Sequence, residues 1–335
     1  MIKVAINGFG RIGRLAFREI VTSTDFEVVA INDLTQAEDL AYLLKYDTNH
    51  RRFHEDKISF EDNYIVINNK VKIPVYAEKD PINLPWKELG VDLVLECTGH
   101  FTKLEDAMKH IEAGAKKVLI SAPGKGDMKT IVAGVNDSIL DGNELIVSAA
   151  SCTTNCLAPV LNILDKNFGV KRGFMSTVHA YTNDQATLDI AHKKGYKSRR
   201  GRACAMNIIP SSTGAASAIG KVIPNLEGKL LGGAYRVPVS DGSMIDLVLE
   251  LNQKVTVEEI NKCFEQNTSF ALEITYDPIV SSDVLGKKCG AFVDGELTNV
   301  LDSDNTQLVK IVAWYDNELG YTAQMMRTAK KMFLK

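Results

Sequence analysis

The stretch Ile2-Lys3-Val4-Ala5-Ile6-Asn7-Gly8-Phe9-Gly10-Arg11-Ile12-Gly13 decides the fold of the first part of this 335-residue chain. Residues 2–6 form an apolar, β-branched run, which predicts a short buried strand. A glycine-rich turn and a run with helical apolar spacing follow, and a second apolar run at 28–31 ends at Asn32-Asp33. The order is therefore strand, glycine-rich turn, helix, strand and acid.

This order gives each glycine a physical role in binding a dinucleotide. Gly8 permits the tight turn, Gly10 lets the backbone approach a pyrophosphate, and Gly13 lets helix and strand pack closely. Arg11 and Ile12 begin the helix, whose free N–H groups would receive the phosphates. The alternative is a tight turn that binds no ligand.

Asp33 lies about twenty residues beyond the turn, at the end of the second strand. A carboxylate there accepts hydrogen bonds from the adenosine ribose and repels a 2′-phosphate. The sequence thus predicts NAD as the cofactor, in preference to NADP. The alternative for Asp33 is a strand-end aspartate that only caps a turn.

The alternation of strands and helices up to residue 149 predicts an α/β fold, with a Rossmann-type doubly wound parallel sheet. The stretch 57–76 alternates apolar and polar residues and predicts appended antiparallel strands. Long β-rich segments follow Cys152, and the adjacent ones at 229–239 and 243–251 predict antiparallel pairing in an α+β catalytic domain with a mostly antiparallel sheet. We expect an NAD-binding domain at 1–151, joined by a C-terminal helix at 317–335, and a catalytic domain at 152–316.

The stretch Ser151-Cys152-Thr153-Thr154-Asn155-Cys156 precedes an apolar run at helical spacing. Ser151 is the expected N-cap, which places Cys152 at a helix N-terminus. The positive end of the helix dipole favours a thiolate, the nucleophilic form of cysteine. The alternative is a small buried cysteine on a packed helix, although the polar neighbours fit a core position poorly.

A cysteine that attacks a carbonyl needs a base, and His179 differs from the other five histidines because it ends an apolar strand. Taken alone, such a histidine is more often a satisfied core residue. His100 follows Gly99 at the mouth of the first domain. Polar, charged surroundings predict surface positions for the other four histidines, namely His50, His54, His110 and His192.

Composition excludes several classes of function. The formal net charge of -3 gives no electrostatic reason to expect a dedicated nucleic-acid partner or an anionic membrane surface. Six scattered cysteines lack the paired spacing of a zinc site, so no metal is expected, and they fit a reducing cytoplasm. Neither a signal peptide nor a membrane-spanning apolar run is expected.

Four later motifs complete a pattern with the glycine-rich turn: residues 151–156, His179-Ala180-Tyr181-Thr182, residues 211–216, and Trp314-Tyr315-Asp316-Asn317-Glu318. In this order the motifs resemble phosphorylating glyceraldehyde-3-phosphate dehydrogenase over essentially the whole chain. The resemblance implies a glycolytic homotetramer that oxidises D-glyceraldehyde 3-phosphate with NAD and inorganic phosphate. The product is 1,3-bisphosphoglycerate, formed through a cysteine thiohemiacetal and thioester.

The resemblance also assigns roles to residues. Cys152 matches the nucleophile and His179 its base. Asn317 matches the residue that binds the nicotinamide carboxamide, and the implied cofactor site further includes Lys79, Thr98 and Ser121. Two phosphate sites are implied. The matching residues are Ser151, Thr153, Thr213 and Gly214 for the attacking phosphate, and Thr182 and Arg236 for the substrate's own phosphate, with Arg199 as a further candidate.

Some positions depart from the family pattern and leave alternatives open. Ala191 stands where NAD-preferring members often have proline, so the strictness of the NAD preference stays open. The loop around residues 195–198 is longer, which leaves open which arginine of 199–202 serves a phosphate. Erythrose-4-phosphate dehydrogenase is the nearest rival function, and a semialdehyde dehydrogenase is a more distant one. A redox-sensing or RNA-binding protein is the non-enzymatic alternative.

Overall fold

The computed structural model describes residues 1–303 and 306–334 and divides into two compact units. The first unit comprises residues 1–131, 137–150 and 325–335, and the second comprises 132–136 and 151–324. Residues 132–136, 151 and 317–324 therefore belong with the second unit, whereas we expected them in the first. Lys335, the end of the expected terminal helix, lies outside the described residues.

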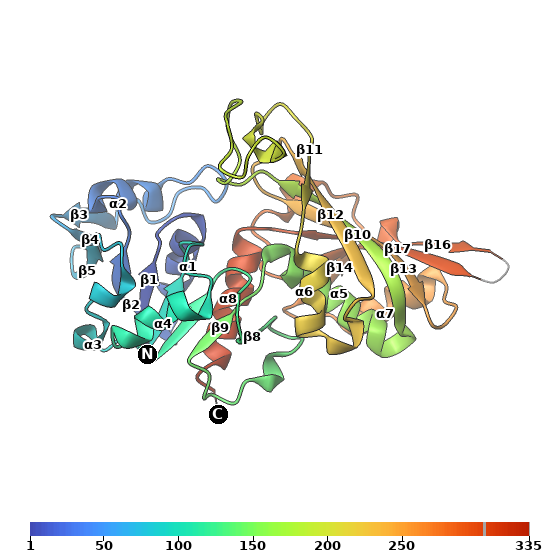
Figure 1. Ribbon diagram of the computed structural model, residues 1–335, viewed down its shortest axis with the longest axis horizontal. Helices are drawn as coiled ribbons and strands as arrows, with labels where there is room; N and C mark the ends of the chain where they lie inside the picture. Colours follow the sequence, from blue (N-terminus) through green and yellow to red (C-terminus); the bar gives the residue numbers. More distant parts are fainter. Residues whose placement is uncertain (304–305, 335) are drawn as a thin grey trace. The chain divides into compact units, whose positions relative to one another are not determined.

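The first unit is built on a nine-stranded sheet with the order β3-β4-β5-β2-β1-β6-β7-β9-β8 (Figure 1, blue to green). The strands β5, β2, β1, β6, β7, β9 and β8 each run parallel to the next in this order, while β4 pairs antiparallel with both β3 and β5, as expected. The elements are β1 (Ile2–Asn7), α1 (Arg11–Ile20), β2 (Phe26–Asn32), α2 (Ala37–Lys45), β3 (Ile58–Glu61), β4 (Tyr64–Ile67), β5 (Val71–Tyr76), α3 (Trp86–Leu89), β6 (Leu93–Glu96), α4 (Leu104–Glu112), β7 (Lys117–Ile120), β8 (Lys129–Thr130) and β9 (Ile146–Ser148), with short 3-10 turns at Pro81–Asn83 and Asp137–Ile139.

The parallel register brings three polar strand ends into one row. Asn7 at the end of β1 stands opposite Asn32 at the end of β2 on one side, and opposite Glu96 at the end of β6 on the other. The residues just before them, Ile6, Ile31 and Leu95, are fully buried, because helices cover an apolar sheet of this kind on both faces. The row therefore lies where ligands bind in open α/β sheets.

The second unit joins α5 (Cys152–Phe168) to an eight-stranded sheet with the order β11-β12-β10-β13-β17-β15-β14, in which β16 also pairs with β17. Most of its neighbouring strands are antiparallel. The other elements are β10 (Val170–Ala180), β11 (Ile209–Ser212), α6 (Ala215–Val222), β12 (Leu230–Val237), β13 (Ser243–Leu251), α7 (Val257–Gln266), β14 (Leu272–Thr275), β15 (Ala291–Asp294), β16 (Asn299–Asp302), β17 (Gln307–Tyr315) and the first part of α8 (Leu319–Lys331), with 3-10 turns at Arg199–Gly201, Pro224–Leu226, Ser281–Val284 and Gly295–Leu297.

One predicted pairing is wrong. The segments at 229–239 and 243–251 form β12 and β13, but these strands are not neighbours, since β10 lies between them. β12 runs parallel to β10, and α6 lies in the connection between the two strands. Adjacency along the chain misled the prediction, because a crossover through a helix returns the chain parallel to the strand it left.

Two further predictions need correction. The terminal helix begins at Leu319 instead of 317, because the Asp316 carboxylate accepts the backbone N–H groups of Glu318 and Leu319 and caps the helix there. His110 is completely buried in α4 instead of lying on the surface.

Among the described residues, no helix combines the length and apolar character needed to cross a membrane.

Candidate active site

Cys152 and His179 lie in contact. Ser151 caps α5 as predicted, since its hydroxyl accepts the N–H of Thr154 at 3.1 Å, and Cys152 is therefore the first residue of the helix. His179 is the penultimate residue of β10, and its side chain points to the same face of the sheet as the buried Met175 and Thr177. The Cys152 Sγ lies 3.4 Å from Nε2 of His179.

The surroundings of His179 assign its tautomer. Nδ1 lies 2.7 Å from the carbonyl oxygen of Ala180, a pure acceptor, so Nδ1 carries the hydrogen. Nη1 of Arg236 also lies 3.0 Å from Nδ1, but its two hydrogens have other acceptors, the Ala180 carbonyl at 2.8 Å and the Thr182 hydroxyl at 3.0 Å. Nε2 is therefore left with its lone pair facing the Cys152 thiol.

Burial dominates the pKa values of this pair. Burial, and then the positive charge of Arg236, lower the pKa of His179 to about 3, so the imidazole is neutral near pH 7. Burial raises the pKa of the Cys152 thiol, against the opposing effects of Arg236, Thr153 and the helix backbone. The expectation that the helix N-terminus alone favours the thiolate is therefore wrong in direction, because the cost of desolvation is larger.

A buried tyrosine, Tyr315, contacts Thr153, Thr177 and His179 in the site. The Tyr315 hydroxyl lies 2.9 Å from that of Thr153 and 2.8 Å from that of Thr177, and the Tyr315 ring meets the His179 ring edge-on with centroids 5.9 Å apart. Burial raises the pKa of Tyr315 well above its usual value, so this residue stays a neutral phenol. Thr153 is itself buried, although the sequence analysis took the polar neighbours of Cys152 as a sign of exposure.

An arginine cluster lies beside His179. Arg236 donates to Thr182, whose hydroxyl in turn donates to Asp184, and Asp184 forms an ion pair with Arg200. Within the described part of the chain, Nε of Arg236 is buried and has no hydrogen-bond partner. An unpaired buried N–H is costly unless a ligand accepts it, so this atom points to an anion as the missing partner.

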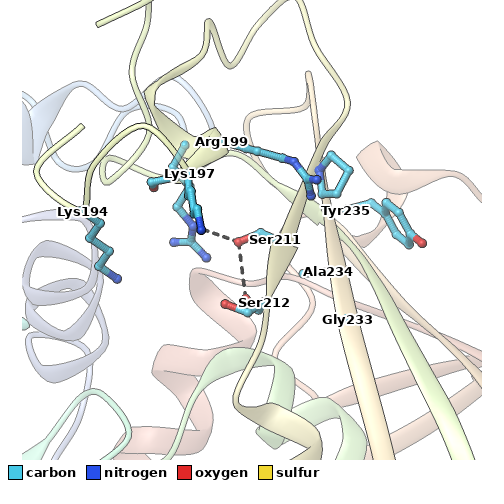
Figure 2. Close-up of a pocket in the computed structure, with 11 residues that line it drawn as sticks. Lys194, Lys197, Arg199, Ser211, Ser212, Gly233, Ala234 and Tyr235 are labelled. Atoms are coloured by element: carbon cyan, nitrogen blue, oxygen red, sulfur yellow. Dashed lines mark hydrogen bonds between the residues drawn. The ribbon is translucent and has the colours of Figure 1, made fainter. Parts of the chain in front are cut away.

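Arg199 does not belong to this cluster. It is exposed and lines a cavity of about 640 Å³ together with Lys194, Lys197 and Tyr235, and in Figure 2 its side chain extends toward Tyr235. Arg200 lines the same cavity, but it also reaches the Ser211 hydroxyl with Nε at 3.0 Å and pairs with Asp184. The structure therefore links Arg200, and not Arg199, to Arg236.

The remaining predicted residues of the second unit lie at element ends. Thr213 and Gly214 precede α6, where Gly214 is the N-cap and the Thr213 hydroxyl accepts the N–H of Ala215, the first helical residue, at 3.2 Å. Asn317 follows β17, and its Oδ1 accepts the Ser243 hydroxyl at 2.6 Å. Ser243 also accepts the N–H of Ala180 at 3.0 Å, which ties Asn317 to the strand end that carries His179.

The glycine-rich turn of the first unit fits a dinucleotide. A Cβ on Gly8, whose φ is +90°, would lie 2.7 Å from the backbone nitrogen of Thr98, and a Cβ on Gly13 would lie 2.1 Å from the Gly8 carbonyl oxygen. A Cβ on Gly10 would meet nothing within 4 Å, so that position opens outward. α1 begins without a side-chain cap, and N–H groups at a helix start of this kind can bind phosphate oxygens.

The other predicted cofactor residues surround the same turn. Asp33 accepts the Phe9 N–H at 2.7 Å and lines a cavity of about 430 Å³ with Gly8, Lys79 and Thr98. The Arg11 side chain instead pairs with Asp47, and this hydrogen bond holds the pKa of Asp47 at about 2 although burial alone would raise it. Arg11 and Ile12 are therefore candidates to bind the cofactor through the backbone at the start of α1.

Ser121 follows β7, and its side chain bonds to the Cys97 thiol. Burial raises the pKa of that thiol to about 12, despite the hydrogen bond from Ser121. Cys97 is therefore a poor nucleophile, although it lines the cofactor cavity.

Residues 2–104 match the glyceraldehyde 3-phosphate dehydrogenase NAD-binding domain, and residues 151–317 match the C-terminal domain of the same enzyme. The chain belongs to the glyceraldehyde 3-phosphate dehydrogenase family. It is 56% identical over 328 residues to glyceraldehyde-3-phosphate dehydrogenases of Clostridium pasteurianum and Clostridium acetobutylicum. It is also 52% identical over 329 residues to that of Streptococcus pyogenes. Each alignment covers 98% of this chain and 97% of the relative.

Membership of the glyceraldehyde 3-phosphate dehydrogenase family confirms the predicted fold class and NAD as the cofactor. Sequence reasoning missed several residues that the structure brings to the site, namely Asp184, Arg200, Ser243 and Tyr315. Arg200 lies in the basic run 199–202 that was noted, and Tyr315 lies in a quoted motif, so both had a signal. Ser243 and Asp184 had none, because the pairing of β13 with β10 brings Ser243 to Ala180 and loop contacts with Thr182 and Arg200 hold Asp184.

Proposed function

We propose that this protein oxidises D-glyceraldehyde 3-phosphate, with NAD and inorganic phosphate, to 1,3-bisphosphoglycerate. The observation that carries the proposal is the 3.4 Å contact between the Cys152 thiol and the lone pair of His179, beside a buried arginine with an unsatisfied N–H. A nucleophile, a base and an anion site are what phosphorylating oxidation of a phosphorylated aldehyde needs.

The first step forms a bond between the Cys152 sulfur and the aldehyde carbon. His179 accepts the thiol proton, the sulfur attacks, and the carbonyl electron pair moves to oxygen, which takes the proton to give a thiohemiacetal. The imidazole is neutral near pH 7, so the lone pair of Nε2 is available to the thiol proton. The backbone N–H of Cys152 at the start of α5 can stabilise the developing oxyanion.

The second step converts the thiohemiacetal into a thioester. His179 accepts the hydroxyl proton as the hydride leaves the carbon. NAD, when bound, supplies the hydride acceptor. Inorganic phosphate then attacks the thioester, the carbon–sulfur bond breaks, and Cys152 leaves as a thiolate that recovers its proton.

Two phosphate groups need separate binding sites. Arg236 and Thr182 are proposed to hold the substrate's phosphate, since Nε of Arg236 lacks a partner. Ser151, Thr153, Thr213 and Gly214 are proposed for the attacking phosphate, where the start of α6 offers backbone N–H groups. The ion pair between Arg200 and Asp184 supports Arg200, in place of Arg199, as the further arginine.

The proposed cofactor site follows the residues of the glycine-rich turn. Gly8, Gly10 and Gly13 shape the turn, the α1 backbone at Arg11 and Ile12 receives the pyrophosphate, and Asp33 binds the ribose. Lys79, Thr98 and Ser121 are the further proposed contacts in the first unit. Asn317, oriented by Ser243, is proposed to bind the carboxamide.

A homotetramer is proposed from the open face of the eight-stranded sheet. Phe174 and Leu231 are each 66% exposed and are direct neighbours across β10 and β12, and Val248 on β13 extends the same row. An apolar row of this kind on an exposed sheet face favours burial against another protein surface, and a second copy is the occupant we propose. Phe174→Glu should shift the mass measured by light scattering below that of a tetramer. An unchanged mass would exclude this face.

A cytoplasmic location is also proposed. All six cysteines are free thiols, which suits a reducing compartment, and the proposed substrates are soluble metabolites. Cell fractionation with an antibody to the full chain would check it.

The direct test of the function is NAD reduction with glyceraldehyde 3-phosphate, with and without inorganic phosphate. Sustained turnover that requires phosphate supports the proposal. Faster turnover with erythrose 4-phosphate, or turnover that does not depend on inorganic phosphate, would favour the rival function, erythrose-4-phosphate dehydrogenase. Neither the geometry nor the similar proteins favours the redox-sensing or RNA-binding alternative.

A further inference from the structure

Glu96 and His110, which the chemistry of Cys152 does not use, are buried together in the first unit. Glu96 is 1% exposed and His110 is fully buried, and Nε2 of His110 lies 3.1 Å from Oε2 of Glu96. Glu96 ends β6 in the row of polar strand ends, next to Asn7. Burying a carboxylate is costly unless several donors surround it, so this pair calls for an explanation.

The direction of the hydrogen bonds around His110 is fixed by a tryptophan. The indole nitrogen of Trp86 only donates, and it lies 3.0 Å from Nδ1 of His110, which must therefore accept. The ring hydrogen of neutral His110 is thus on Nε2, from which it is donated to Glu96. Trp86 is itself fully buried, so packing in the core fixes the orientation of the His110 ring.

One arm of the network runs from Glu96 to the ends of β1 and β2. Oε2 of Glu96 accepts the Asn7 amide at 2.5 Å, and Oδ1 of Asn7 accepts the Asn32 amide at 2.7 Å. Asn32 in turn bonds to both backbone groups of Glu78, each at 2.9 Å. This arm ends at the wall of the cofactor cavity that holds Asp33 and Lys79.

The other arm runs from Glu96 to the opposite wall. Oε1 of Glu96 accepts both the backbone N–H of Thr98, at 2.9 Å, and the Thr98 hydroxyl. The Thr98 hydroxyl also accepts the N–H of His100 at 3.0 Å. Since a Cβ on Gly8 would lie 2.7 Å from the Thr98 nitrogen, the position of Thr98 determines how closely the glycine-rich turn can pack.

We propose that Glu96, together with Asn7 and His110, is a positioning centre for the cofactor. Glu96 does not line the cavity of about 430 Å³, whereas Asn7, Asn32, Thr98 and His100, which it holds directly or through one partner, all do. A cavity whose walls are ordered in advance binds its ligand more tightly, because less conformational freedom is lost on binding. The inference rests on the NAD binding proposed above, and not on the identity of the aldehyde.

An exchange of two side chains tests this centre. Glu96→Gln places an amide donor against the donors of Asn7 and His110, and Asn7→Asp places two carboxylates side by side, so each change alone creates a conflict. The double variant exchanges carboxylate and amide without changing net charge. The carboxylate at position 7 can accept from the new amide, from Asn32 and from Nε2 of His110, which lies 3.4 Å from the present Asn7 amide.

The measurement is the dissociation constant for NAD, by calorimetry on the full chain without substrate. We expect each single change to weaken NAD binding about tenfold or more, and the double variant to return within about threefold of the wild type. The rate of Cys152 alkylation by iodoacetamide, without NAD, should stay unchanged in all folded variants. A purely structural role would instead lower the thermal stability of the single variants and leave the NAD affinity of their folded fraction unchanged.

A double variant whose loss equals the sum of the single losses would overturn the proposal. If a single variant fails to fold, the double variant still decides the question: wild-type affinity supports the centre, and weak binding or misfolding contradicts it. Because calorimetry needs no aldehyde, an enzyme with normal NAD binding and no activity on glyceraldehyde 3-phosphate would refute the proposed substrate alone.

Discussion

The Cys152 sulfur and Nε2 of His179 lie 3.4 Å apart, although 27 residues separate them in the sequence. α5 places the cysteine at its first residue, and β10 returns along the sheet to place the histidine near its end. The Ala180 carbonyl directs the hydrogen of His179 to Nδ1, so Nε2 can act as a base. The chemistry proposed for this protein depends on this contact.

His179→Asn should slow aldehyde oxidation by about 10²–10⁴-fold, because the base that accepts the thiol and hydroxyl protons is lost. Single-turnover measurement of NADH formation at saturating NAD checks this. The dissociation constant for NAD should be unchanged. A rate within about threefold of the wild type would remove His179 from the mechanism.

The same residue makes folding sensitive to acid. The pKa of His179 is about 3 in the folded chain, against an ordinary value of 6.5, so below pH 6.5 the unfolded chain binds a proton that the folded chain does not. This site therefore lowers the free energy of unfolding by about 1.4 kcal/mol per pH unit as the pH falls from 6.5 toward 3. Urea titrations at several pH values should show a shallower dependence for His179→Asn. Cys152→Ser, which keeps the histidine, is the control, and equal slopes in both variants would refute the prediction.

Arg200→Ala should raise the KM for glyceraldehyde 3-phosphate or for inorganic phosphate about tenfold, because Arg200 holds Asp184 and adds positive charge near Arg236. Arg199→Ala is the matched control, since this neighbour is exposed and Arg200 is the arginine that pairs with Asp184, and we expect a change below about twofold. Steady-state kinetics with each substrate varied would show the difference. The assignment fails if the control variant has the larger effect.

The glycines of the turn should separate folding from binding. Gly13→Ala should lower the free energy of unfolding by about 1–3 kcal/mol, because its Cβ would lie 2.1 Å from the Gly8 carbonyl oxygen. Gly10→Ala has open space around its Cβ, so stability should change little while NAD binding weakens. Thermal unfolding and NAD titration of both variants test this pair, and equal losses of stability would contradict it.

Local patterns in the sequence predicted what depends on local physics. The strand, turn and helix around Gly8 and the cap at Ser151 follow from spacing and residue type, and the structure has both. The parallel pairing of β10 with β12 could not be predicted, because it depends on a crossover and not on adjacency. That pairing places Arg236 opposite His179, so the anion cluster depended on it too.

The burial of polar groups was also not predicted from the sequence. His110 sits in a charged stretch of sequence, which predicts exposure, yet α4 turns it onto Glu96 and Trp86. The pKa of Cys152 was misjudged for a related reason, since burial outweighs the helix terminus and burial cannot be read from neighbouring residues. Which arginine faces the site likewise depends on the shape of one loop.

The covalent role of Cys152 determines how much NADH forms when enzyme, NAD and glyceraldehyde 3-phosphate are mixed without inorganic phosphate. A thioester on Cys152 predicts a burst of about one NADH per chain that then stops, and that becomes sustained turnover when phosphate is added. Cys152→Ser should give no burst while binding NAD normally. Steady turnover without phosphate, or a burst in the serine variant, would contradict the covalent mechanism.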